Sequence, residues 1–262
     1  MNFCEEDYIV TPTIAEFVNT LSNVSYIYFA WSTWPKKARW PPMMNVSLFL
    51  VGLTSAFLHA TLKHYTQIAD ETSMYLLTAS IDWNLYSYPG AIFSGRVAKP
   101  VFTTSLWAAC ALVVYINFTA GGADFGIHTM LFISLLTALW PRCLYLLAER
   151  RRLEREGTMK KGTTSAAALR NRFKVGASCF LLGFGLWLVD CAFCYELRAF
   201  RERIGMPFAW FTEMHAWWHV LTALGAEAFV NLANVFSSED DGNIKVPVKH
   251  KGAANGVAKQ PT

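Results

Sequence analysis

The sequence predicts an all-α protein, a bundle of seven transmembrane helices. Of its 262 residues, 53% are hydrophobic and only 16% are charged, whereas about a quarter of the residues in a soluble domain are charged. Apolar stretches long enough to cross a bilayer recur along the chain. Lys and Arg are concentrated in alternate loops between these stretches, as expected of a multi-pass membrane protein. The composition therefore excludes an ordinary soluble domain.

Seven apolar stretches reach spanning length. They cover residues 13–34, 44–63, 68–88, 100–119, 123–148, 173–194 and 211–236. The third is the weakest because it contains Asp70, Glu71 and Asp82. We expect residues 1–236 to form one transmembrane domain. Residues 237–262 are polar and mixed in charge, and we expect them to form a disordered cytosolic tail.

The orientation follows from the positive residues in the loops. One side of the membrane has Lys36, Lys37, Arg39, Arg96, Lys99, Arg150, Arg151, Arg152, Arg155, Lys160, Lys161, Arg170, Arg172, Lys174 and the lysines of the tail. The other side has only Lys63, Arg198, Arg201 and Arg203. Because cytoplasmic loops carry the excess of Lys and Arg, the N-terminus is predicted to be lumenal and the C-terminus cytosolic.

Two histidines begin the seventh stretch, in the sequence His-Ala-Trp-Trp-His. His215 and His219 are four residues apart, so they project from one face of a helix. That spacing suits two ligands of one zinc ion. The alternative is a pair of histidines that only form hydrogen bonds inside a helix bundle. The pair alone does not decide between these interpretations.

Other polar residues fall at the same depth on the same side. His59 is near the outer end of the second stretch, Asp70 near the outer start of the third, and Asp190 near the outer end of the sixth. Ionisable groups in a membrane are costly and mark functional sites, so their common depth predicts a shared site. His59 would complete a three-histidine zinc centre with an open fourth position, the catalytic arrangement. The rival interpretation is a proton or ion path in a receptor or transporter.

Two residues suit catalysis beside such a zinc ion. Asp70 is the predicted proton acceptor and donor, because amide hydrolysis must protonate the departing nitrogen. Ser55 precedes His59 by one helical turn, so its hydroxyl could reach a developing oxyanion. Its alternative role is a hydrogen bond to its own helix backbone. Asp82 and Asp190 have two interpretations, as partners that orient the imidazoles or as interhelical hydrogen-bond acceptors.

Four segments together resemble the alkaline ceramidase family. They are CEEDYIVTPTIAEFVNTLSN at 4–23, Ser55-x₃-His59-x-Thr-Leu with Asp70 after it, Asp190-x₂-Phe-Cys-x₂-Leu-Arg198, and HAWWH at 215–219. The resemblance implies a seven-helix zinc amidase that cleaves ceramide, within the bilayer, to a sphingoid base and a fatty acid. It assigns zinc to His59, His215 and His219, and catalytic roles to Ser55 and Asp70. It also implies a multi-pass protein of the endoplasmic reticulum membrane, or of the Golgi membrane.

The resemblance further implies a lumenal calcium site that activates the enzyme. The implied ligands are Asn2, Phe3 through its carbonyl, Glu5, Asp7 and Glu16. The chain departs from the commoner family pattern, which has Asp in place of Asn2 and often Asn in place of Asp7. Without calcium, the acidic segment would be a solvated N-terminus that caps the first helix near Thr11 or Thr13.

A lumenal disulfide is implied as well. The family pattern pairs Cys4 with Cys194, and Cys191 is the alternative partner on the same side of the membrane. Two further rivals share the seven-helix build, namely a zinc-containing receptor of the adiponectin-receptor type and a glycosylphosphatidylinositol-remodelling lipase. The receptor type has its N-terminus in the cytosol, opposite to the orientation that the loop charges predict here.

Overall fold

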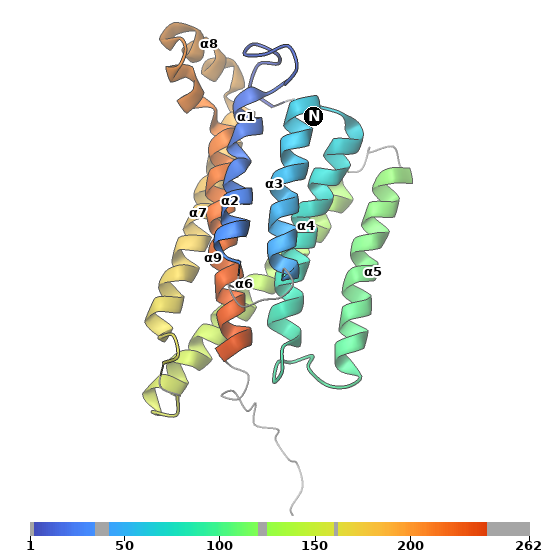
Figure 1. The fold of residues 1–262 in the computed structure, drawn as a ribbon, viewed down its shortest axis with the longest axis vertical. Coiled ribbons are helices and arrows are strands. Elements are labelled where there is room, and N and C mark those ends of the chain that lie inside the picture. The colour runs from blue at the N-terminus through green and yellow to red at the C-terminus, as the bar shows by residue number, and fades with distance from the viewer. Residues whose placement is uncertain (1–2, 35–41, 120–124, 160–161, 240–262) are drawn as a thin grey trace, which may run out of the picture.

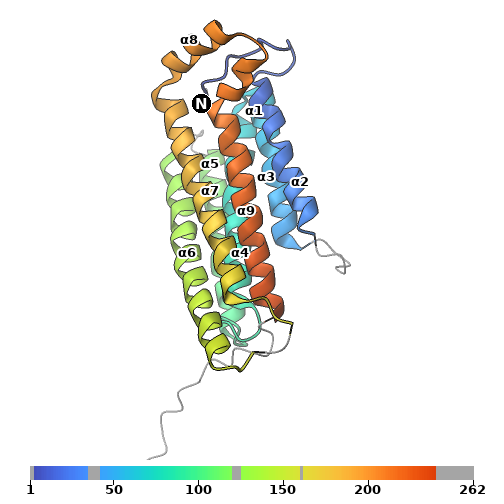
Figure 2. The same cartoon turned by 90° about the vertical axis from the view of Figure 1, so that its left-hand side faces the viewer.

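The computed structural model describes residues 3–34, 42–119, 125–159 and 162–239, and shows an elongated bundle of helices (Figures 1 and 2). In these ranges the only extended pairing is an isolated bridge between Thr11 and Ile14. The all-α prediction is therefore confirmed. Asn2 and residues 240–262, which include nearly all of the predicted tail, lie outside the described ranges.

The helices follow the apolar stretches of the sequence. They are α1 (Phe17–Ser22), α2 (Val24–Ser32), α3 (Met43–Thr61), α4 (His64–Ser87), α5 (Ala98–Thr119), α6 (Phe125–Arg155), α7 (Ala166–Ala192), α8 (Cys194–Ile204), the 3₁₀-helix η1 (Phe208–Thr212) and α9 (Met214–Glu239). Helices α6 and α7 are longer than the predicted spans, because their charged ends continue the helix beyond the apolar part.

Five of these helices, in the part of the chain that the structure describes, are long and apolar enough to cross a membrane: α3, α5, α6, α7 and α9. The chain is accordingly a multi-pass membrane protein. The predicted span at 13–34 is divided at Asn23 into α1 and α2, each too short to cross alone. The predicted span at 68–88 corresponds to α4, which is long but carries Asp70, Glu71 and Asp82. Seven spans therefore remain a prediction.

Helix α9 is the central element of the bundle, since it contacts α1, α2, α3, α4 and α7. Its C-terminal half contributes Phe229, Leu232 and Phe236, all almost fully buried, to the largest apolar core. Gly225 permits close packing against α7, because a Cβ there would lie 2.7 Å from the Phe180 ring. This packing fixes α9 against the neighbouring helices.

A second close approach joins α3 to the junction of α1 and α2. A Cβ at Gly52 would lie 2.9 Å from the Asn23 carbonyl oxygen and 2.9 Å from the Tyr26 Cβ. Only glycine leaves room for this approach. It brings the last turns of α3, with Ser55 and His59, beside the α1–α2 junction.

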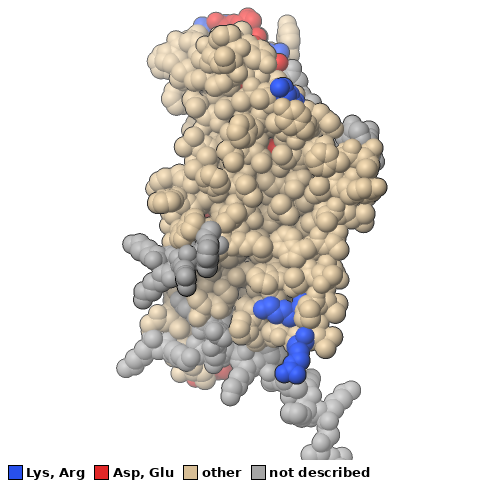
Figure 3. All heavy atoms as spheres, turned by 45° about the vertical axis from the view of Figure 1, so that its right-hand side comes forward, with Lys and Arg blue, Asp and Glu red and all other residues tan. Residues whose placement is uncertain are grey.

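The N-terminal segment and α8 lie at the same end of the bundle, opposite the C-terminal end of α9 (Figure 1). The segment is joined to the end of α3 by two backbone hydrogen bonds, Ala15 N to Ala60 O at 3.1 Å and Glu16 N to His59 O at 3.0 Å. On the face drawn in Figure 3, charged side chains gather toward the two ends and the middle is almost free of them. That distribution suits a protein embedded in a bilayer.

Candidate metal centre

Three histidines from two helices converge at the end of the bundle nearest the N-terminal segment. His59 comes from the last turn of α3, and His215 and His219 from the first turns of α9. Their candidate ligand atoms all lie within 4.8 Å of one another. The three residues are 1%, 4% and 3% exposed. The structure thus brings together the three residues that the sequence predicted as zinc ligands.

His59 has a carboxylate partner. Its Nδ1 lies 2.5 Å from Oε2 of Glu16, the fully buried residue that precedes α1. The same carboxylate accepts hydrogen bonds from Asn19 Nδ2 at 3.0 Å and from the backbone N of Phe3 at 3.3 Å. A carboxylate on the Nδ1 proton fixes the ring and leaves Nε2 free to bind a metal.

His219 is fixed in the same way by a hydroxyl. Ser22 Oγ lies 2.7 Å from His219 Nδ1. Because the Ser22 hydroxyl donates its own proton to the Asn19 carbonyl at 2.8 Å, its oxygen accepts the Nδ1 proton of His219. The Nε2 lone pair of His219 is therefore available. Ser22 ends α1, so the α1–α2 junction has a structural role at the metal centre.

His215 differs from the other two. Its Nδ1 is buried and has no hydrogen-bond partner among the described residues. Its backbone N–H donates to the carboxylate of Asp190 at the end of α7. A buried ring nitrogen without a partner is unusual and needs an explanation such as an ion. Three neutral, largely pre-oriented imidazoles in a buried site fit zinc.

Ser55 and Asp70 lie beside this cluster. Ser55 is buried one turn before His59 on α3, and its hydroxyl donates to the partly buried carboxylate of Asp70 on α4. Tyr26 of α2 is within electrostatic range of Asp70, and its ring centroid lies 6.4 Å from that of His219. The Tyr26 hydroxyl bonds Thr222 Oγ1 at 2.5 Å. The structure therefore places Ser55 and Asp70 side by side. Tyr26 also lies near this site and was not predicted from the sequence.

Asp82 does not reach the histidines. It lies about 18 Å further along α4 than Asp70, and both of its oxygens lack hydrogen-bond partners among the described residues. Asp190 does not bond an imidazole either, since it binds the backbone N of Cys4 at 3.2 Å and that of His215. Neither carboxylate therefore orients an imidazole directly. The hydrogen-bond partners of His59 and His219 are Glu16 and Ser22 instead.

The acidic N-terminal segment lies directly over the metal centre. Both Glu5 oxygens accept backbone N–H groups at the start of α1, from Val18 at 2.7 Å and Asn19 at 2.8 Å. Glu5, rather than Thr11 or Thr13, therefore caps that helix. Burial, with a smaller contribution from the charge of Glu16, raises the pKa of Glu5 to about 7, against the lowering effect of these two hydrogen bonds and of Arg201.

The remaining candidate calcium ligands fall close by. Asp7 is exposed and within electrostatic range of Glu16, and the Phe3 carbonyl lies 3.5 Å from Arg198 Nη2. Oxygen donors from carboxylates and a backbone carbonyl on an irregular segment fit calcium by chemistry. The neighbouring guanidinium offsets part of the negative charge, and Asn2 is outside the described residues.

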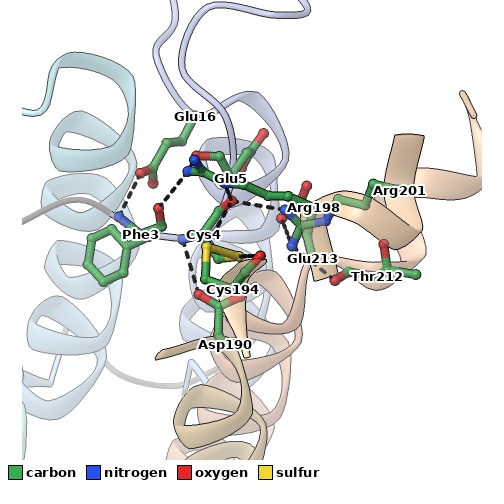
Figure 4. Close-up of a disulfide and its surroundings, with 10 residues drawn as sticks. All are labelled: Phe3, Cys4, Glu5, Glu16, Asp190, Cys194, Arg198, Arg201, Thr212 and Glu213. Carbon is green, nitrogen blue, oxygen red and sulfur yellow. Dashed lines mark hydrogen bonds and ion pairs between the residues drawn. A yellow bond between two sulfur atoms is a disulfide. The ribbon is translucent and has the colours of Figure 1, made fainter. Parts of the chain in front are cut away.

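A disulfide joins Cys4 to Cys194 at the start of α8 (Figure 4), with a Cα–Cα distance of 5.2 Å. Cys191 is free and exposed. The Cys4–Cys194 pairing is therefore confirmed and the Cys191 alternative is wrong. Around the disulfide, Arg198 Nε and Arg201 Nη1 each donate to the Cys4 carbonyl at 2.9 Å. Arg201 also pairs with the buried Glu213 at 2.8 Å, just before α9.

The chain is similar to proteins of known family. The Ceramidase family model matches residues 1–251. Alkaline ceramidase 3 of Mus musculus is 27% identical over 246 residues, which cover 86% of this chain and 79% of that protein. Alkaline ceramidase YPC1 of Saccharomyces cerevisiae is 28% identical, with 88% of this chain and 74% of that protein covered. The alkaline ceramidase of Arabidopsis thaliana is 25% identical, with 85% and 78% covered. On its family match and its helical bundle, the chain belongs to the ceramidase family.

Proposed function

We propose that this chain is a zinc-dependent alkaline ceramidase, which hydrolyses the amide of a ceramide, phytoceramide or dihydroceramide to a sphingoid base and a fatty acid. The observation that carries the proposal is the cluster of three buried histidines beside Ser55 and Asp70. It occurs in a chain that matches the Ceramidase family over residues 1–251. Relatives named alkaline ceramidase support the choice of substrate.

The protein's part in the chemistry begins with the histidines. Glu16 and Ser22 keep the Nδ1 protons of His59 and His219 in place, so their Nε2 atoms point away from these partners. Zinc, when bound there, supplies a nucleophile from water at neutral pH and polarises a carbonyl oxygen. His59, His215 and His219 would hold it.

Asp70 moves the protons. Its carboxylate accepts a proton as water adds to the amide carbon, and returns it to the nitrogen as the C–N bond breaks. One water is consumed, its oxygen and one hydrogen enter the fatty acid, and its other hydrogen reaches the amine. Ser55 donates to the Asp70 carboxylate in this structure. When Asp70 holds a proton, the Ser55 hydroxyl is free to donate to the oxyanion.

Calcium activation is the second part of the proposal. Glu16 accepts the proton of His59, and the charge of Asp7 acts on Glu16. A cation held by Asp7, Glu5 and Glu16 would therefore influence the orientation of a zinc ligand through one shared carboxylate. With the N-terminus lumenal, as the loop charges indicate, the ion would come from the lumen of the endoplasmic reticulum or Golgi.

The test is hydrolysis of a panel of ceramides by the purified protein, with and without a zinc chelator. We expect the parent protein to release fatty acid, the chelator to abolish release, and added zinc to restore it. His215→Ala should lose both zinc and activity. His64→Ala is the matched control, because His64 is exposed at the same end of the bundle. Full hydrolysis by zinc-free protein would refute the zinc assignment, and failure to cleave any ceramide would refute the substrate.

A further inference from the structure

The side chain of Phe3 lies against the metal centre. Its ring centroid is 4.1 Å from that of His215, with an interplanar angle of 32°, and 4.8 Å from that of His59. The rings of these two histidines are themselves 5.0 Å apart. One aromatic ring from the N-terminal segment thus contacts ligands from both α3 and α9. The implied calcium site concerns only the backbone carbonyl of this residue and leaves its ring without a role.

The backbone around Phe3 is fastened to several elements, as Figure 4 shows. The Phe3 N–H donates to Glu16 at 3.3 Å, which ties it to the start of α1. The next residue, Cys4, donates to Asp190 of α7 at 3.2 Å. Its carbonyl accepts from Arg198 and Arg201 of α8 at 2.9 Å each. Because the Cys4–Cys194 disulfide adds a covalent tie, the ring is held in one place.

The other sides of the histidine cluster are already occupied. Glu16 lies against Nδ1 of His59, and Ser22 against Nδ1 of His219. Ser55 lies one turn before His59 on α3, and its hydroxyl donates to Asp70 of α4. The N-terminal segment crosses the outer end of the bundle (Figure 1). The Phe3 ring therefore covers His59 and His215 on the side of that end.

We propose that Phe3 is a positioning residue that covers the aqueous side of the metal centre. It holds the His59 and His215 rings in place and restricts exchange of water-soluble molecules with the centre. The disulfide keeps this cover closed by anchoring the residue next to Phe3. The inference rests on the metal centre of the proposed function and not on its substrate.

The test measures how fast zinc leaves the loaded protein when an excess of a water-soluble chelator is added. Phe3→Ala should lose zinc about tenfold faster than the parent, which corresponds to about 1.4 kcal/mol of activation free energy. Phe3→Trp keeps an aromatic cover and should lose zinc at nearly the parent rate. Phe57→Ala is the matched control, because Phe57 is also on α3 near His59 but 54% exposed. It should behave as the parent does.

A second arm tests the anchoring by the disulfide. Reduction should accelerate zinc loss from the parent but add little in Phe3→Ala, because both changes remove the same cover. If Phe3→Ala does not fold or retain zinc, Phe3→Leu is measured instead and must still lose zinc faster than the parent.

Three results would overturn the proposal. They are zinc loss at the parent rate in Phe3→Ala (or in Phe3→Leu where it replaces it), equal acceleration of zinc loss in that variant and in Phe3→Trp, and a reductant that accelerates zinc loss from that variant as much as from the parent. Zinc loss is followed without any ceramide, so a wrong choice of substrate would leave this test readable.

Discussion

Glu16 belongs to two candidate sites at once, and this changes how each can be tested. It was predicted from the family resemblance as a calcium ligand, but in the structure its carboxylate bonds Nδ1 of His59 at 2.5 Å. Removing Glu16 would weaken the binding of zinc and of calcium together. Loss of a hydrogen-bond partner of a metal-binding histidine lowers metal affinity by about 10–100-fold. A clean test of calcium needs a residue that touches no histidine.

Asp7 is that residue, because it is exposed and acts on Glu16 only through its charge. We expect Asp7→Asn to reduce the activation by calcium while the zinc content stays at that of the parent protein. The measurement is hydrolysis against calcium concentration in reconstituted protein, with zinc determined on the same sample. Glu6→Gln, the exposed neighbour, is the control and should respond normally. An unchanged calcium response in Asp7→Asn would remove this residue from the site.

Asp70 and Ser55 make the second prediction at the residue scale. Asp70→Asn keeps the shape of the side chain but loses the base, so turnover should stop while zinc remains bound. Ser55→Ala should reduce kcat by about 10²–10³, the usual effect of one oxyanion donor. Rates and zinc content are measured together, with Glu71→Gln as the control, because the neighbouring Glu71 carboxylate accepts a hydrogen bond from Gln67 Nε2 at 2.8 Å. Loss of zinc in Asp70→Asn would mean that Asp70 acts as a ligand or in folding.

At the scale of elements, the junction between α1 and α2 decides how the metal centre is assembled. Ser22 at this junction bonds His219 of α9 at 2.7 Å, and Gly52 lets α3 approach the junction closely. The close approach at Gly52 therefore sets the separation between the His59 and His219 sides of the site.

Gly52→Ala tests this separation. The added Cβ would lie 2.9 Å from the Asn23 carbonyl oxygen, so α3 must move away from α1 and α2. We expect a loss of about 1–3 kcal/mol in the free energy of unfolding, as for overpacked cores, together with weaker zinc binding. Thermal melting and zinc titration measure the two effects. Gly185→Ala is the control, because a Cβ there meets nothing within 4 Å. Equal melting of both variants would contradict the role given to Gly52.

At the scale of the whole molecule, the Cys4–Cys194 disulfide joins the N-terminal segment to the start of α8, directly after α7. Cys4 and Cys194 are 190 residues apart in sequence, and the bond joins the segment over the metal centre to α8. Arg198, Arg201 and Asp190 bind the same backbone of Cys4. The segment is thus a fixed part of the bundle rather than a loose tail.

Cys4→Ser should therefore destabilise the whole protein. Because loss of a disulfide frees the unfolded chain, we expect the free energy of unfolding to fall by about 2–4 kcal/mol. The melting temperature of the purified protein, without reductant, measures the effect. Cys191→Ser is the control, since this thiol is free and exposed and should leave the melting temperature unchanged. Reductant should lower the melting temperature of the parent and of this control, but not that of Cys4→Ser.

The sequence by itself determined the parts of the protein that depend on local spacing and composition. Apolar length and sparse charge predicted a helical membrane protein, and the i, i+4 spacing of His215 and His219 placed both on one helix face. Common depth in the membrane grouped them with His59, Asp70 and Asp190, and the four-residue spacing placed Ser55 on the helix face of His59. Helix geometry fixes such relations over one or two turns, so no tertiary contact was needed to infer them.

Only the tertiary structure decided which side chains support these residues. Glu16 is 43 residues from His59, and Ser22 is 197 residues from His219. No sequence periodicity connects positions so far apart, and Phe3 was foreseen only for its carbonyl. The division of the first span at Asn23 is equally a result of packing, because its apolar composition permits one continuous helix. These contacts exist because α3 and α9 pack on the α1–α2 junction, and close packing chooses partners that local propensity does not specify.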